Sequence, residues 1–203
     1  NRVRRQRQMC IRDRINTASA REEDSIAIVG LGGVGLSALL ASIAIGSKKT
    51  IAIDLSNEKL NLAHELGADH ILNPNDANFL ERVRDLTSGG ANIAIETAGS
   101  GRALKTAYDI TRRGGTTVAA GMPGPKVDIT LSHLSIAAEE RIIKGSYMGS
   151  CIAHRDIPKY LDMFQTGKLP VDRLLSRKIT FEDLNAAMDR LDDAKTVREV
   201  LIP

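Results

Sequence analysis

Four glycines fall within the six residues Gly30-Leu31-Gly32-Gly33-Val34-Gly35, and this run constrains the fold more than any other feature. It follows the apolar stretch 25–29, typical of a buried strand, and precedes a helix-like stretch. A glycine-rich turn between strand and helix is typical of a dinucleotide-binding unit. Gly30 permits the tight turn, Gly32 lets the backbone approach a pyrophosphate closely, and Gly35 lets the helix pack against the strand.

The same glycines argue against a membrane span. Residues 25–47 form a run of 23 residues without a charge, which is long enough to cross a bilayer as a helix. Each interior glycine, however, destabilises a helix by about 1 kcal/mol relative to alanine. A strand, a tight turn and a buried helix explain the run better, so we predict no membrane partner.

Strand-like and helix-like segments alternate from residue 24 to residue 149. Strands are expected at 25–29, 50–54, 70–72, 92–95, 116–120 and 141–145. They are apolar at successive positions, which is typical of strands covered by helices on both faces. Short glycine-containing links between alternating strands and helices indicate right-handed crossovers. The sequence therefore predicts an α/β fold with a doubly wound six-stranded parallel sheet, the Rossmann arrangement.

Helix starts are predicted from short polar side chains. Ser56 is the expected N-cap of the second helix, and Asn75 or Asp76 that of the third. Beyond the sheet, a helix is expected at 156–165, and Thr180 with Asp183 forms a capping-box pattern for another.

Three parts are predicted along the chain: a basic tail at 1–19, a cofactor-binding domain at 20–149 and a C-terminal segment at 150–203. The last segment ends in a strand-like or short helical run at 197–202. About 55 residues are too few for a good core of their own, so this segment needs another surface to pack against.

The positive net charge of +3 comes from the tail, because residues 1–14 hold six arginines and one acid. The other 189 residues carry 22 basic and 24 acidic side chains, so no nucleic-acid partner is predicted. The tail resembles translated adapter DNA and is expected to be non-native and disordered. A transit peptide and a nucleic-acid arm remain alternatives.

Asp54 supports the dinucleotide hypothesis. It ends the second expected strand, 19 positions after Gly35, where a carboxylate accepts hydrogen bonds from the adenosine ribose. It would repel a 2′-phosphate, and no arginine follows it directly, so NAD is predicted over NADP. Lys59 lies one turn into the next helix and could reach the ribose. A methyl-donor fold is the nearest alternative, although its turn usually has fewer spaced glycines.

With these residues in place, the chain resembles the zinc-type medium-chain alcohol dehydrogenase family from about residue 16 to residue 203. Beside the glycine run, the markers are Ala52-Ile53-Asp54, Leu66-Gly67-Ala68-Asp69-His70, Glu96-Thr97-Ala98-Gly99, Ala120-Gly121-Met122-Pro123, Lys144-Gly145-Ser146-Tyr147-Met148-Gly149-Ser150 and Thr196-Val197-Arg198. The resemblance implies an NAD-dependent oxidoreductase that transfers hydride between an alcohol or aldehyde adduct and NAD.

The resemblance also implies site residues. Together with the motif analysis, it predicts a cofactor site of Gly30, Gly32, Gly33, Val34, Gly35, Asp54, Leu55, Lys59, Thr97, Ala98, Ala120, Gly121, Met122, Ser146, Met148 and Arg198. Val34 would lie against the nicotinamide, Leu55 and Ala98 on either side of the adenine, and Thr97 in the cleft between them. The backbones of Ala120, Met122, Ser146 and Met148 would bind the carboxamide, and Arg198 would pair with the pyrophosphate. Ser100 stands where some members carry an arginine over the adenine.

In this family a catalytic domain that holds the zinc ligands precedes the cofactor domain. Cys10 does not match the family surroundings, and Cys151 with His154 is too few ligands for zinc. Zinc is therefore expected in the full-length protein only, and this chain is expected to bind NAD without turnover. A free-standing NAD-binding sensor or interaction module is the alternative. A homodimer or homotetramer, formed through residues 129–144, and a cytoplasmic location are further expectations.

Overall fold

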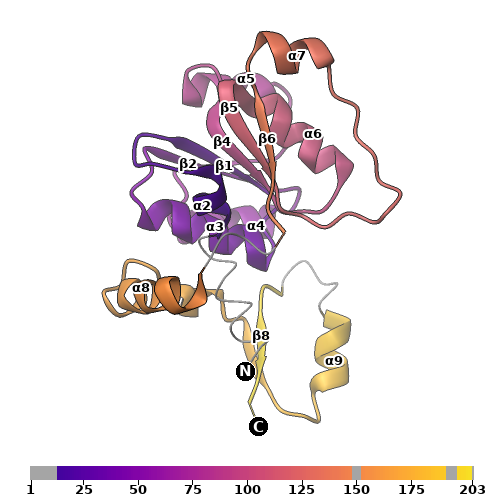
Figure 1. The fold of residues 1–203 in the computed structure, drawn as a ribbon. Helices are drawn as coiled ribbons and strands as arrows, with labels where there is room; N and C mark the ends of the chain where they lie inside the picture. The colour runs from indigo at the N-terminus through magenta and orange to yellow at the C-terminus, as the bar shows by residue number, and fades with distance from the viewer. Residues whose placement is uncertain (1–12, 148–151, 191–195, 203) are drawn as a thin grey trace.

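The computed structural model of the chain describes residues 13–147, 152–190 and 196–202. Its centre is a parallel sheet with the strand order β3-β2-β1-β4-β5-β6 (Figure 1). The strands are β1 (Ser25–Val29), β2 (Lys49–Ile53), β3 (His70–Leu72), β4 (Ala91–Glu96), β5 (Thr111–Ala119) and β6 (Ile142–Gly145). Every neighbouring pair is parallel. The predicted doubly wound six-stranded sheet is confirmed.

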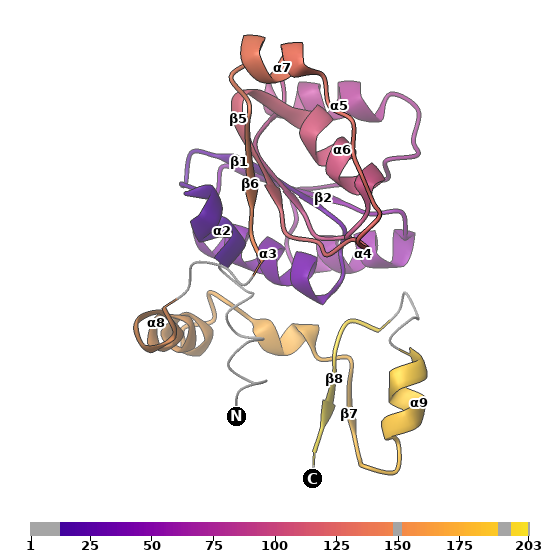
Figure 2. The same ribbon diagram turned by 45° about the vertical axis from the view of Figure 1, so that its right-hand side comes forward.

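Helices cover both faces of the sheet (Figure 2). The helices are α2 (Asp13–Ala18), α3 (Gly33–Ala44) and α4 (Asn57–Glu65) on one face, and α5 (Phe79–Thr87) and α6 (Gly101–Ile110) on the other. Helix α7 (His133–Ala138) lies in the connection from β5 to β6. In β1, Ile26 and Ile28 pack with α3, whereas Ala27 and Val29 pack with α5 and α6. This double coverage explains why the strands are apolar at successive positions.

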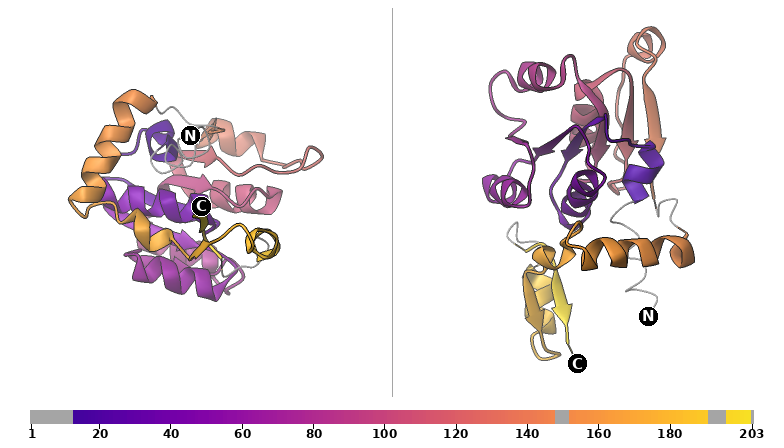
Figure 3. Two further views of the ribbon diagram at one scale, coloured as in Figure 1. Left: turned by 90° about the horizontal axis from the view of Figure 1, so that it is seen from below. Right: turned by 90° about the vertical axis from the view of Figure 1, so that its left-hand side faces the viewer.

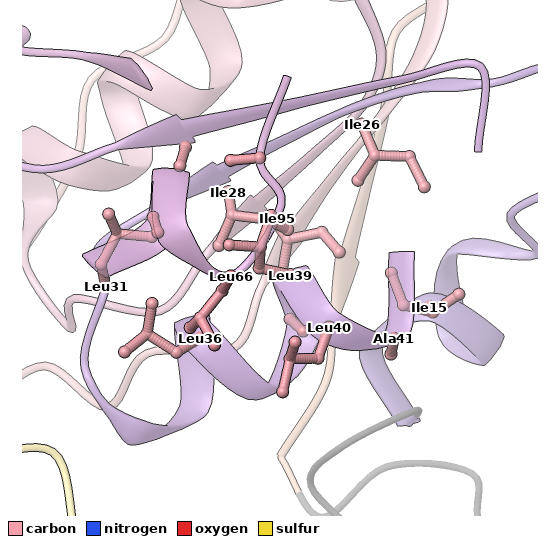
Figure 4. Packing of buried hydrophobic residues seen from close by; sticks show 14 of the residues in the cluster. Ile15, Ile26, Ile28, Leu31, Leu36, Leu39, Leu40, Ala41, Leu66 and Ile95 are labelled. Atoms are coloured by element: carbon pink, nitrogen blue, oxygen red, sulfur yellow. The ribbon is translucent and has the colours of Figure 1, made fainter. Parts of the chain in front are cut away.

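The long uncharged stretch divides as predicted. Strand β1 and the 12-residue helix α3 share it, with the glycine turn between them. Figure 4 shows Leu39 of α3 beside Ile28 and Ile95 of the strands, and Leu36 and Leu40 belong to the same buried cluster. In the part of the chain that the structure describes, no helix has the length and apolar character needed to cross a bilayer.

The prediction that the tail is disordered is wrong for residues 13–18. Residues Asp13–Ala18 form helix α2, and the side chains of Ile15 and Ala18 are buried in the core. Figure 4 shows Ile15 beside Ala41 of α3. The Lys144 ammonium group donates to the Thr17 carbonyl at 3.3 Å. Apolar burial therefore extends the packed domain before residue 19. Residues 1–12 lie outside the described residues.

Two predictions near the third and fifth strands are corrected. Helix α5 has Asn78 at its N-cap, because Asn75 and Asp76 take part in the preceding turn with Asn73. Ser56 does cap α4, with its hydroxyl accepting from the Lys59 N–H. Strand β5 begins five residues earlier than expected, at Thr111. It pairs with β4 there and then shifts register before Thr116, so Gly114 and Gly115 lie within the strand.

The C-terminal segment extends from the end of the sheet domain (Figure 3). It contains α8 (Ala153–Gln165), the 3₁₀ helix η1 (Val171–Leu174), β7 (Arg177–Ile179), α9 (Leu184–Asp189) and β8 (Glu199–Leu201), with β7 and β8 parallel. Tyr160, Leu169 and Leu174 are buried against the α3 side of the sheet core. The expected need for a surface to pack against is met in part by the sheet domain.

Two details of this segment differ from the prediction. Helix α9 begins at Leu184, because the Thr180 N–H and hydroxyl both bond the Asp183 carboxylate in the turn before the helix. Helix α8 begins three residues before Asp156, whose carboxylate accepts from the Ile152 N–H at its start. The final stretch contains strand β8.

Candidate functional site

The glycine turn has the close contacts that its sequence predicts. Gly30 has φ +94°, and a Cβ there would lie 2.8 Å from the Cβ of Ala98. A Cβ on Gly35 would lie 1.8 Å from the Gly30 carbonyl oxygen and 2.7 Å from Thr97 Oγ1. Both positions therefore require glycine, one for its backbone conformation and contact, the other for helix-to-strand packing.

Gly32 is different, because it faces open space. It is the N-cap of α3, and among the described residues no atom lies within 4 Å of an added Cβ. The first turn of α3 contains no acidic side chain. The N–H groups of this turn can therefore donate hydrogen bonds to an anion, and the positive end of the helix dipole favours its charge.

Asp54 lies immediately after β2 and is held by two backbone groups. Its Oδ2 accepts from the Leu31 N–H at 2.6 Å, and its Oδ1 accepts from the Ser56 N–H at 2.9 Å. The carboxylate thus joins the glycine turn to the start of α4. Each oxygen retains a lone pair for a further donor, such as a sugar hydroxyl.

Asp54 borders a cavity of about 250 Å³ at the carboxyl ends of β1 and β2. Its lining residues are Val29, Gly30, Ile53, Asp54, Leu55, Lys59, Pro74, Ala98, Ser100, Arg102, Ala103 and Thr106. Five predicted site residues meet here: Gly30, Asp54, Leu55, Lys59 and Ala98. We call this space the Asp54 cavity.

Arg102 of the Asp54 cavity was not predicted. Its Nη2 donates to Asn75 Oδ1 at 2.7 Å, which links α6 to the segment after β3. The signal available in the sequence was its place in the first turn of the helix that follows Ala98. A guanidinium at that point offers a flat cation beside the cavity.

Arg198 reaches the glycine turn from the far end of the chain. A Cβ on Gly33 would lie 3.3 Å from the Val197 carbonyl oxygen and 4.0 Å from Arg198 Nη2. Gly33, Val34 and Arg198 line a second cavity of about 410 Å³, bounded by α9 and β8. The structure therefore brings a predicted cationic residue close to the open N-terminus of α3.

Ser176 holds the backbone of this arginine and was also missed. The Ser176 hydroxyl accepts from the N–H groups of Val197 and Arg198 at 3.0 and 3.2 Å. The Ser176 N–H donates to the Arg198 carbonyl at 2.8 Å. A serine 22 residues away in sequence carries no recognisable signal for this role.

An ion pair connects α9 to β8 beside Arg198. The Arg190 guanidinium donates to both oxygens of Glu199, at 2.9 and 3.0 Å. The hydrogen bond from Arg190 holds the pKa of the Glu199 carboxyl below its ordinary value. This pair joins the two elements that border the second cavity.

The remaining predicted residues lie at the carboxyl ends of β4, β5 and β6. Thr97 Oγ1 donates to the Gly30 carbonyl at 2.6 Å, and the Ser146 N–H donates to the Ala119 carbonyl at 2.8 Å. Thr97, Ala98 and Gly99 form what we call the β4 loop, and Ala120, Gly121 and Met122 form the β5 loop. Met148 lies outside the described residues.

The described residues do not fit a zinc site. Among residues 13–147, 152–190 and 196–202, no three His, Cys, Asp or Glu side chains are grouped so as to hold a metal ion. His154 is exposed on α8, and Cys10 and Cys151 lie outside the described residues.

Comparisons with known proteins agree with this geometry. The family described as zinc-binding dehydrogenase matches residues 33–166. A geraniol dehydrogenase of Castellaniella defragrans is 32% identical over 189 residues, which are 93% of this chain and 50% of that protein. The chain thus spans about half the length of the curated relatives it matches.

Solved structures give the same result. An alcohol dehydrogenase zinc-binding domain protein from Burkholderia ambifaria matches with a TM-score of 0.91 and 28% identity, over 98% of this chain and 53% of that one. A benzyl alcohol dehydrogenase from Acinetobacter calcoaceticus matches with a TM-score of 0.90 and 29% identity, over 96% and 54%. With the sequence match and the Rossmann-type sheet, these findings show that the chain belongs to the zinc-binding dehydrogenase family.

Proposed function

We propose that the chain binds NAD across the carboxyl ends of its sheet and forms the cofactor-binding part of a longer alcohol dehydrogenase. The observation that carries the proposal is the open N-terminus of α3 at Gly32, with Asp54 on one side and Arg198 on the other. The helix N-terminus would bind the pyrophosphate, and Arg198 would add a cation to it.

The adenosine would occupy the Asp54 cavity. Leu55 and Ala98 are exposed and line this cavity, so they can contact the two faces of an adenine. Asp54 would accept hydrogen bonds from the ribose hydroxyls and repel a 2′-phosphate, which favours NAD over NADP. Lys59 would lie near the same sugar.

The nicotinamide would lie toward β5 and β6. Val34 lines the second cavity near the glycine turn, and the β5 loop and Ser146 stand at the carboxyl ends of the next strands. Backbone groups of Ala120, Met122, Ser146 and Met148 would orient the carboxamide. The bound nicotinamide supplies the carbon that accepts hydride.

The test is a fluorescence titration of the chain with NADH and NADPH. Asp54→Asn should weaken NADH binding about tenfold and reduce the preference over NADPH, because the neutral amide loses the charge and one acceptor. Asp109→Asn is the matched control, since Asp109 pairs with Lys105 on α6 and does not line the Asp54 cavity. Equal affinities in all three proteins would remove Asp54 from the proposal.

The substrate of the whole protein would be an alcohol or an aldehyde, as the names of the relatives suggest. Because the described residues do not form a zinc site, the zinc ligands would come from the part of the longer protein that this chain lacks. We expect the 203-residue chain, supplied with NAD, zinc and an alcohol, to form no NADH above the buffer rate. The longer protein should form NADH under the same conditions, and turnover by the chain alone would contradict this assignment.

The exposed apolar surface of the C-terminal segment favours this proposal over a free-standing module. Phe181 and Met188 are 62% and 59% exposed, an arrangement that suits a surface covered by further chain.

We also propose a homodimer or homotetramer through residues 129–144, because β6 is an edge strand with exposed Ile142 and Ile143. Light scattering should then give a mass above that of one chain, 21.9 kDa, and Ile143→Lys should lower the measured mass. The cytoplasmic location stays a prediction.

A further inference from the structure

Glu96 is a buried acid that the proposed cofactor contacts do not use. It is the last residue of β4, and its side chain is 2% exposed. Burying a carboxylate is unfavourable unless hydrogen bonds replace its water. The hydrogen-bond partners of the Glu96 carboxylate should therefore show which parts of the chain it holds in place.

The two oxygens of Glu96 bind two different loops. Oε1 accepts from the Gly99 N–H of the β4 loop at 2.6 Å, and Oε2 accepts from the Gly121 N–H of the β5 loop at 3.2 Å. The Glu96 carbonyl also accepts from the N–H groups of Ala120 and Gly121, at 2.9 and 3.0 Å. One residue thus satisfies backbone donors on both loops.

The loops also touch each other through glycine backbones. A Cβ on Gly121 would lie 2.2 Å from the Gly99 nitrogen, and a Cβ on Gly99 would lie 2.9 Å from the Met122 carbonyl oxygen. The two loops can approach this closely because neither glycine has a side chain. Glu96 lies beneath that contact, since the added Cβ of Gly121 would also be 2.7 Å from its Oε1.

Each loop serves a different part of the site. Ala98 of the β4 loop lines the Asp54 cavity, and Thr97 donates to Gly30. The β5 loop stands at the carboxyl end of the next strand, toward the proposed nicotinamide position. We propose that Glu96 is a positioning residue that sets the distance between the adenine side and the nicotinamide side of the site. This inference rests on the proposed function.

The test compares NADH with ADP-ribose, which lacks the nicotinamide, on the whole 203-residue chain. In Glu96→Gln one carboxylate oxygen becomes an NH₂ group, which cannot accept a hydrogen bond. The remaining oxygen should stay on the shorter bond to the Gly99 N–H, so the β5 loop loses its bond to the side chain and keeps only its bonds to the Glu96 main-chain carbonyl. NADH affinity should fall about tenfold while ADP-ribose affinity changes by less than about twofold.

Thr117→Val is the control for a loss of stability alone. Thr117 is buried in β5, and its hydroxyl bonds that of Thr111 at 2.8 Å. This variant should have a lower thermal midpoint and an unchanged ratio of NADH to ADP-ribose affinity. A lower midpoint together with a changed ratio in Glu96→Gln therefore reports positioning.

Gly99→Ala provides a second test that leaves the carboxylate in place. Its Cβ should push the β5 loop away and lower the same ratio, which decides the matter if Glu96→Gln does not fold. An unchanged ratio in the folded variants would overturn the inference while the proposed function stands. If the unaltered chain bound neither NADH nor ADP-ribose, the proposed function would fail, and this inference with it.

Discussion

The sheet domain and the C-terminal segment bury their apolar side chains to very different extents. Ile26, Ile28 and Leu39 of the sheet domain are fully buried, whereas Phe181 and Met188 of the C-terminal segment are largely exposed. The sheet domain has helices on both faces and closes its own core. In the C-terminal segment only the part that packs near α3 is buried, and the rest of its apolar surface stays exposed.

The proposed site nevertheless needs both regions. The sheet domain supplies the open helix N-terminus and the Asp54 cavity, and the C-terminal segment supplies Arg198. A well-packed region thus provides the shape of the proposed site, while a less enclosed region provides one of its charges. The comparison teaches that stability and binding can be separated by substitutions in the two regions.

The largest expected effect is on stability, and its absence would contradict the difference in packing between the sheet domain and the C-terminal segment. Leu39→Ala removes a fully buried side chain of α3 and should lower the free energy of unfolding by about 4 kcal/mol. Met188→Ala, on exposed α9, should change it by less than about 0.5 kcal/mol. Urea unfolding of both variants measures this difference. Similar losses would show that the C-terminal segment is as tightly packed as the sheet domain.

The next effect separates two glycines of the same turn. Gly35→Ala places a Cβ 1.8 Å from a backbone oxygen and should cost about 3 kcal/mol of stability, with loss of NADH binding. Gly32→Ala meets open space at φ −73° and should keep the thermal midpoint while weakening NADH binding. If Gly32→Ala bound NADH normally, the phosphates would not lie at this helix N-terminus.

A smaller effect tests the link between the regions. Ser176→Ala removes the hydroxyl that accepts from the N–H groups of Val197 and Arg198, so the arginine should be less well placed. NADH affinity should fall about fivefold, comparable to the loss of one hydrogen bond. Arg198→Ala should lower NADH affinity further than Ser176→Ala does. Adding Ser176→Ala to the Arg198→Ala variant should lower the affinity little more. Additive losses would mean that Ser176 acts independently of Arg198.

The smallest effect concerns pH within the C-terminal segment. Because the hydrogen bond from Arg190 lowers the folded-state pKa of Glu199, the pair contributes its full stabilisation above the ordinary pKa that Glu199 has in the unfolded chain. That contribution is lost as the pH falls through the lower, folded-state pKa. Glu199→Gln should therefore lower the thermal midpoint at pH 7 but not at pH values below the folded-state pKa. A constant difference across this range would contradict the role of the charge.

Most of the fold was predictable because local patterns and packing agree. Buried strands, helix caps such as Ser56 and the glycine turn each leave a short-range signature. The misassigned places are those where tertiary contacts decide. Ile15 becomes part of the core, and β5 begins at Thr111 because Ala91 of β4 offers it a partner there.

The site divides in the same way. The glycine run and Asp54 could be predicted as site residues from the sequence, because the proposed phosphate turn and ribose carboxylate need those residue types at that spacing. Arg198 followed from resemblance alone, Glu96 appeared only within a family marker and was given no role, and Arg102 and Ser176 went unnoticed. Their roles depend on which backbone groups the fold brings within hydrogen-bond distance of one side chain.

The amino-acid sequence alone was sufficient for the sheet and the strand-to-helix turn, and it suggested the proposed dinucleotide, since these depend on periodicity and on neighbours in the chain. Only the tertiary structure shows that Glu96 joins two loops and that Arg198 meets Gly33. These contacts bring together residues up to 165 positions apart, and no local pattern encodes such a meeting.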